Sequence, residues 1–150
     1  MDDVMQMQNQ TYVEKIMYKA TLEKIKELCP EKLFVEYAVS LPNGRKGSYD
    51  FLIEHNGTRI GFELMSRPTK GKLKEKLAYL HNVDKYIFVF PMASFELYKR
   101  QQINCFTALT RPKFFPEDFS NKKLYVWLCS IDEKRIVTQA RFEKIFNVKK

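Results

Sequence analysis

The chain has 150 residues, 45% of them hydrophobic, which suits one domain built around a single core. Its formal net charge of +8 and pI of about 9.3 favour a polyanionic partner such as nucleic acid. No apolar run reaches the roughly 18 residues that a membrane helix needs, and the three scattered cysteines form neither a zinc-binding pattern nor a disulfide framework. We therefore expect a single cytoplasmic domain over residues 1–150, with no membrane contact.

The first predicted element is a helix over residues 11–29, where apolar side chains recur at helical spacing up to Pro30. A strand follows over residues 33–41. Two further strand-like runs, 48–55 and 58–65, flank Asn56 and Gly57, a dipeptide typical of a tight hairpin turn. Beyond them the pattern predicts a helix over 70–81, a buried strand over 84–91, a helix over 95–109, a loop over 110–121, a hairpin of 124–131 with 134–138, and a short helix over 141–146.

This order of elements is typical of an α/β domain with a mixed β-sheet flanked by helices. The 84–91 strand follows a helix that crosses over from the 58–65 strand, so we expect those two strands to run parallel. The last two strands and the short helix add a C-terminal β-hairpin to this core.

The turn at Asn56 and Gly57 predicts the register of its hairpin, because a two-residue loop fixes which residues face each other. In that register Asp50 faces Glu63 across the strands, with Cβ atoms about 4.5–5.5 Å apart. Two carboxylates this close must share a proton or a cation, and Mg²⁺ prefers such oxygen ligands. Gly61, on the same face, leaves space for a ligand. The alternative is a pair of solvated acids relieved by a nearby lysine. The predicted apolar face holds Ile53 with Ile60, Phe51 with Phe62, and Tyr49 with Leu64.

With Asp50 in SYD and Glu63 in GFELM, residues 11–91 resemble the PD-(D/E)XK nuclease superfamily, which includes many restriction endonucleases and archaeal Holliday junction resolvases. The resemblance implies a restriction-endonuclease-like α-β-β-β-α-β core, with residues 92–150 as an elaboration. It implies a Mg- or Mn-dependent endonuclease that hydrolyses phosphodiester bonds, with DNA as the expected substrate. The metal would be held by Asp50, Glu63 and the carbonyl of Leu64. A homodimer and a role in a virus or mobile element also fit this resemblance.

The chain departs from the superfamily pattern at Met65, which stands where the motif lysine is expected, and at Tyr49, which replaces a proline. In some relatives the basic group has moved into the following helix. Here the following segment offers Arg67, Lys70, Lys72, Lys74 and Lys76, of which Lys70 is the preferred replacement and Arg67 the second choice. The alternative is a solvated basic helix face that binds phosphates, so that a nuclease-fold protein without cleavage activity, which binds DNA or regulates a partner, remains the competing function. A module for protein interaction with incidental acids is a third.

The superfamily often adds an acidic ligand from the first helix. Glu14 and Glu23 flank its apolar stripe on opposite sides, and Glu23 is preferred because it lies nearer to the hairpin in the sequence. Residues expected to contact the nucleic acid backbone are Lys72, Lys74, Lys76, Lys99 and Arg100.

Overall fold

The computed structural model describes residues 11–94 and 123–145, except for the side chain of Lys70, and all structural statements concern these residues. The elements are α2 (Tyr12–Glu27), β1 (Lys32–Ser40), β2 (Lys46–His55), β3 (Thr58–Leu64), α3 (Lys70–Lys76), the 3₁₀-helix η1 (Leu77–Asn82), β4 (Lys85–Pro91), β5 (Leu124–Ser130), β6 (Arg135–Arg141) and α6 (Phe142–Ile145). The predicted helix at 95–109 and loop at 110–121 lie outside the described residues.

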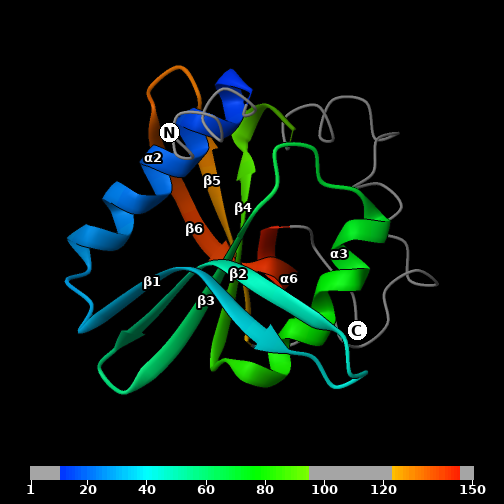
Figure 1. Ribbon diagram of the computed structural model, residues 1–150. Helices are drawn as coiled ribbons and strands as arrows, with labels where there is room; N and C mark the ends of the chain where they lie inside the picture. The colour runs from blue at the N-terminus through cyan, green and yellow to red at the C-terminus, as the bar shows by residue number, and fades with distance from the viewer. Residues whose placement is uncertain (1–10, 95–122, 146–150) are drawn as a thin grey trace, which may run out of the picture.

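Six strands form one mixed sheet in the order β1-β2-β3-β4-β5-β6 (Figure 1). The pairs β3–β4 and β4–β5 are parallel, and the other neighbouring strands are antiparallel. The predicted α/β class, the parallel pairing of β3 with β4 and the C-terminal hairpin are therefore confirmed. Within the described residues, no helix is long and apolar enough to cross a bilayer.

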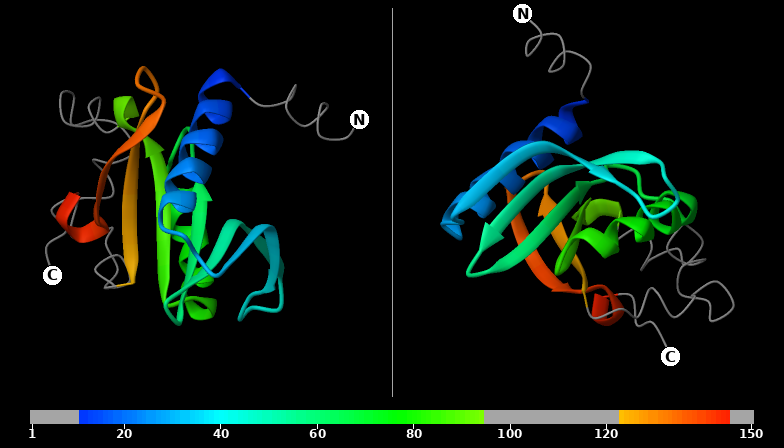
Figure 2. Two further views of the ribbon diagram at one scale, coloured as in Figure 1. Left: turned by 90° about the vertical axis from the view of Figure 1, so that its left-hand side faces the viewer. Right: turned by 60° about the horizontal axis from the view of Figure 1, so that its bottom comes forward.

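Helices cover both faces of the sheet (Figures 1 and 2). Helix α2 begins with a capping box, in which Thr11 and Glu14 each bond the other's backbone N–H, and it buries Met17, Ala20 and Ile25 against one face. Helix α3, η1 and α6 cover the other face, where Leu73, Leu80 and Phe142 are buried among the even-numbered residues of β4 and β5. The region predicted as one helix over 70–81 tightens to a 3₁₀-helix at Leu77, and Tyr79 and Leu80 are both buried there.

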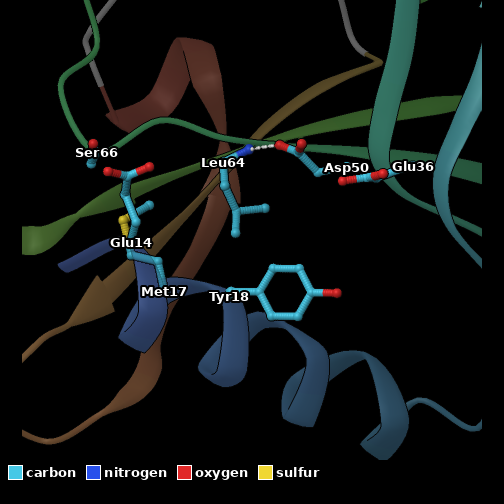
Figure 3. Close-up of a pocket in the computed structure, with 7 residues that line it drawn as sticks. All are labelled: Glu14, Met17, Tyr18, Glu36, Asp50, Leu64 and Ser66. Carbon is cyan, nitrogen blue, oxygen red and sulfur yellow. Dashed lines mark hydrogen bonds between the residues drawn. The ribbon is translucent and has the colours of Figure 1, made fainter. Parts of the chain in front are cut away.

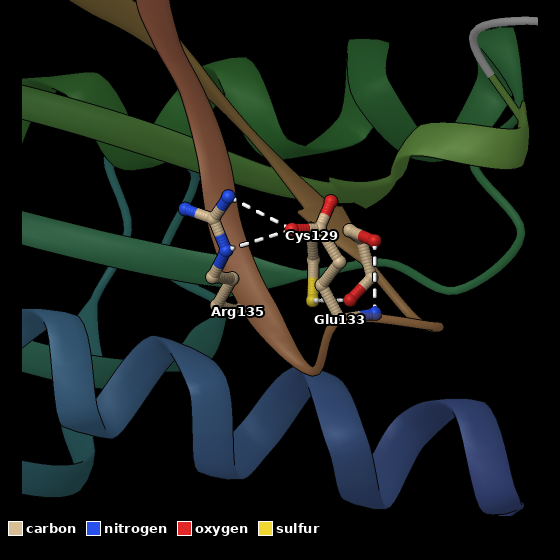
Figure 4. A network of polar contacts seen from close by, with 4 residues as sticks. Cys129, Glu133 and Arg135 are labelled. Carbon is tan, nitrogen blue, oxygen red and sulfur yellow. Dashed lines mark hydrogen bonds and ion pairs between the residues drawn. The ribbon is translucent and has the colours of Figure 1, made fainter.

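The β5–β6 turn closes the hairpin with local polar contacts (Figure 4). The Ser130 hydroxyl accepts the Glu133 N–H at 3.1 Å, and the Arg135 Nε and Nη2 donate to Glu133 Oε1 at 3.0 and 2.8 Å. Lys134 takes a positive φ of 57°. Exposed ion pairs of this kind add little stability, so we assign the contacts to shaping the turn.

In β1 and β2 the side chains alternate between the two faces of the sheet, but this alternation shifts by one residue at positions that lie across from each other in the two strands. Phe51 packs on the α2 face and Leu52 on the α3 face, as in a regular strand, but Tyr49 also packs on the α3 face. In β1, pairing is regular on both sides of Glu36, which itself has a positive φ of 52° and lies across from Asp50. The prediction that Tyr49 shares the apolar face of Phe51 is therefore wrong, because the strand is irregular at Asp50.

This reversal also changes the role of Gly61. The ring of Tyr49 lies over Gly61, and a Cβ there would come within 2.6 Å of the ring. The space predicted for a ligand at Gly61 is thus filled by Tyr49, which is fully buried and whose hydroxyl donates to the Tyr79 carbonyl at 2.5 Å.

We expect Gly61→Ala to lower the free energy of unfolding by about 1–3 kcal/mol, because the new methyl group overlaps a buried ring that cannot move freely. Gly71→Ala is the matched control. It adds a methyl group to the α3 helix with nothing within 4 Å, and we expect it to be neutral or to stabilise the protein by about 0.5–1 kcal/mol. Chemical denaturation measures both, and equal effects of the two substitutions would contradict the assignment of Gly61.

Candidate functional site

The candidate site lies where the β2–β3 ladder ends. The register predicted from the turn is confirmed from His55 opposite Thr58 through Phe51 opposite Phe62. The ladder stops there, so the predicted pairing of Asp50 with Glu63 is not part of it. Beyond that pair a side chain replaces the backbone as hydrogen-bond acceptor. The Asp50 Oδ2 accepts the Leu64 N–H at 2.7 Å (Figure 3). A charged acceptor makes this a strong hydrogen bond, and it fixes the Asp50 carboxylate beside the end of β3.

Two adjoining cavities meet at this strand end. The first, of about 150 Å³, has Asp50 and Glu36 at one end and Glu14, Met17 and Ser66 at the other, with Tyr18 and Leu64 between them (Figure 3). The second, of about 280 Å³, contains Glu63 and the basic residues of the α3 region. Both cavities share Glu14, Leu64 and Ser66, so the cavity beside Asp50 adjoins the cavity beside Glu63.

The Glu63 side chain is only 13% exposed. Its Oε2 lies 3.3 Å from the Lys76 Nζ, whereas its buried Oε1 has no hydrogen-bond partner in the part of the chain that the structure describes. Burial, with the nearby Asp50 charge, raises the pKa of Glu63 to about 8, and the Lys76 ammonium only partly offsets this. Burial likewise raises the pKa of Asp50, although the Leu64 N–H and Lys76 oppose it.

Lys76 is held in place on two sides. Its Nζ contacts Glu63 and lies 4.6 Å from the centre of the Tyr79 ring. Burial alone would lower the pKa of Lys76, but the charge of Glu63 and the Tyr79 hydroxyl outweigh it, so the pKa lies above its usual value. The ammonium is therefore a fixed positive charge at the acidic pair.

The structure brings together some of the basic residues singled out in the sequence. Arg67 and Lys72 line the cavity that contains Glu63, and the Lys72 Nζ donates to the Arg67 carbonyl at 3.3 Å. Lys74 is exposed and does not line either cavity. Lys70 begins α3, but its side chain lies outside the described part, as do Lys99 and Arg100. Met65, at the motif lysine position, is buried in the core.

The sequence offers Lys76 as one of five basic candidates and as a phosphate contact, but it prefers Lys70 and does not predict the contact of Lys76 with Glu63. The spacing of Lys76 does indicate a position near the core. Lys76 follows the buried Leu73 by three residues, so it lies beside the buried face of α3. Lys70 precedes Leu73 by the same spacing, and spacing alone could not choose between them.

The preference for Glu23 over Glu14 does not agree with the structure. Glu23 is exposed and lines neither cavity, whereas Glu14 lines both. The position along α2 accounts for the difference. Glu14 lies in the first turn, which lines the cavities at the end of β3, whereas Glu23 lies in a later turn that lines neither. Glu14 precedes the buried Met17 by three residues, which places it beside the buried face.

The carboxylate oxygens at this site meet part of what a hard cation requires. The unpartnered, buried Glu63 Oε1 and the fixed Asp50 carboxylate are oxygen ligands of the kind Mg²⁺ uses, and Mg²⁺ needs only one or two carboxylates from the protein. Among residues 11–94 and 123–145, no three His, Cys, Asp or Glu side chains converge into a cage.

Comparisons with known proteins bear on the fold. No protein-family model and no curated protein matches the sequence. The chain is similar in structure to an XisH family protein from Nostoc punctiforme, with a TM-score of 0.53 and 10% identity over 84% of this chain and 99% of that one. It is also similar to an fdxN element excision controlling factor protein from Anabaena variabilis, with a TM-score of 0.55 and 13% identity over 88% of this chain and 100% of that one. These likenesses establish a shared α/β fold.

The pKa of Glu63 predicts how stability depends on pH when metal is removed by a chelator. Between about pH 4.5 and pH 8 the unfolded chain releases a proton that the folded protein keeps. Stability therefore falls as pH rises through this window, by at most about 1.4 kcal/mol per pH unit from this group. Asp50 acts in the same direction. We expect Glu63→Gln to flatten the decline in denaturation curves.

The exposed Glu23 provides the control for this measurement, and Glu23→Gln should keep the pH dependence of the unaltered protein. An equally steep decline in Glu63→Gln would show that Glu63 is not the group that carries it.

Proposed function

We propose that this protein is a metal-dependent nuclease that hydrolyses phosphodiester bonds in DNA, as a degenerate member of the PD-(D/E)XK superfamily. The observation that carries the proposal is that Asp50 bonds the Leu64 N–H and Glu63 pairs with Lys76 at the same end of β3, where the Asp50 charge helps to raise the pKa of Glu63. Two buried acids and one fixed ammonium supply the residue types of the superfamily site. The lysine comes from α3, in place of the strand position held by Met65.

Asp50 and Glu63 would hold Mg²⁺ or Mn²⁺ through their carboxylates, with the Leu64 carbonyl as a third ligand. A cation bound there lowers the pKa of a coordinated water and neutralises charge on a phosphate. The Leu64 N–H orients Asp50 before any ligand arrives. Glu63 must lose its proton to bind the cation, and its raised pKa makes that loss depend on pH.

The Lys76 ammonium is the group that we assign to stabilising negative charge on the scissile phosphate. It is held at Glu63 and opens onto the same cavity, so a phosphate oxygen entering the cavity meets a positive charge already in position. Arg67 and Lys72, exposed at the edge of this cavity, would bind neighbouring backbone phosphates. The net charge of +8 supports such binding. Glu14, at the boundary of both cavities, is the first-helix acid best placed to assist.

One structural neighbour is named for control of the excision of an element, a process that acts on DNA. We infer from this a role in reactions on the DNA of a mobile element. The competing function, a nuclease fold that binds DNA without cutting it, is favoured by the burial of Met65 at the motif lysine position.

Cleavage assays on supercoiled, linear and branched DNA with Mg²⁺ or Mn²⁺ separate these functions. We expect Asp50→Asn, Glu63→Gln and Lys76→Met each to reduce the cleavage rate by about a hundredfold or more, since each removes a charged group worth several kcal/mol to the transition state. Lys74→Met is the matched control for Lys76→Met, because Lys74 is exposed on the same helix and lines neither cavity.

DNA binding by the same variants should persist and weaken with added salt. Binding without cleavage by the unaltered protein would overturn the nuclease and support the competing function. Cleavage that Lys76→Met and Lys74→Met affect equally would overturn the assignment of Lys76.

A further inference from the structure

Three tyrosines form a buried cluster behind Lys76. Tyr49 meets Tyr79 edge to face, with centroids 5.5 Å apart, and meets Tyr86 in the same way at 5.6 Å. Tyr79 stacks on Tyr86 at 6.0 Å with an interplanar angle of 24°. All three side chains are 6% exposed or less, so the cluster is part of the core.

Tyr79 is the member of this cluster that touches Lys76. The Nζ atom lies 4.6 Å from its ring centre, within the range of a cation–π interaction. The same Nζ is 3.3 Å from Glu63 Oε2. The ammonium is therefore confined between a carboxylate on β3 and an aromatic face on η1, and its flexible stem has lost much of its freedom.

Two glycines make room for this arrangement. A Cβ on Gly61 would overlap the Tyr49 ring, as described above. A Cβ on Gly47 would overlap the Tyr79 hydroxyl and lie 2.7 Å from its Cζ. The lack of a side chain at Gly47 therefore sets where the Tyr79 ring can lie.

We propose that Tyr79, backed by Tyr49 and Tyr86 and accommodated by Gly47, is the positioning residue for Lys76 at the acidic pair. A lysine on a strand next to its catalytic carboxylate is held by the strand itself, whereas Lys76 reaches the pair from the last turn of a short helix. The aromatic face supplies the positional constraint that the helix end does not. The inference rests on the proposed function of Lys76 for its catalytic meaning, but the contact itself can be tested without activity.

The test is an NMR measurement on ¹³C-lysine-labelled protein, with the Lys76 ε-methylene signal assigned through Lys76→Arg. Protons above an aromatic face resonate upfield, so the Lys76 signal should lie upfield of exposed lysines such as Lys74. Tyr79→Phe keeps the ring and should keep the shift. Tyr79→Leu removes the ring, and the signal should return to the position of the exposed lysines.

Gly47→Ala provides a second route to the same answer, because it displaces the ring tip while leaving both Tyr79 and Lys76 in the sequence. We expect it to move the Lys76 signal as well, and it decides the question should Tyr79→Leu fail to fold. An unshifted Lys76 signal in the unaltered protein, or one that neither Gly47→Ala nor Tyr79→Leu moves, overturns the proposal.

In cleavage assays we expect Tyr79→Leu to lower the rate by about tenfold with DNA binding unchanged, and Tyr79→Phe to lower it less. The two proposals fail in different ways. If the unaltered protein does not cut DNA but the Lys76 signal behaves as expected, the nuclease is overturned and the positioning contact stands. If the protein cuts DNA and the signal does not move, the positioning role alone is overturned.

Discussion

The hydrogen bond from the Leu64 N–H to the Asp50 carboxylate is the contact on which the site depends. It lies where backbone pairing of β2 with β3 ends, and it uses a charged side chain to satisfy a strand amide. The neighbouring reversal of side-chain alternation sends Tyr49 to the α3 face, and the Asp50 side chain lies beside the end of β3.

The electrostatic consequence is a site that is unfavourable when it holds only protein charges. Burial raises the pKa of both acids, the Asp50 charge adds to the rise at Glu63, and one Glu63 oxygen has no hydrogen-bond partner among the described residues. Lys76 relieves only part of this cost. A buried acid pair of this kind is stabilised by a cation, and sites that carry perturbed acids are often functional. In the proposed function, a bound cation would offset this electrostatic cost.

Much of the fold could be predicted from periodicity and from one turn. Asn56 and Gly57 fixed the β2–β3 register correctly from His55 to Phe51, and apolar runs located the strands. The reversal at Asp50 could not be predicted, because positive φ at Glu36 leaves no mark in a pattern that assumes strict alternation. The same limit applies to the site. Asp50 and Glu63 follow from the hairpin, but Lys76 and Glu14 reach it through helix placement, which depends on tertiary packing.

The central claim is that Asp50 and Glu63 together hold a divalent cation, and calorimetric titration with Mn²⁺ at pH 7 in buffers of different ionisation enthalpy tests it most directly. A Glu63 pKa of about 8 means that this group is mostly protonated at pH 7, so binding should release close to one proton. Asp50→Asn and Glu63→Gln should abolish saturable binding. Binding without proton release, or binding of equal strength in both variants, would contradict the account.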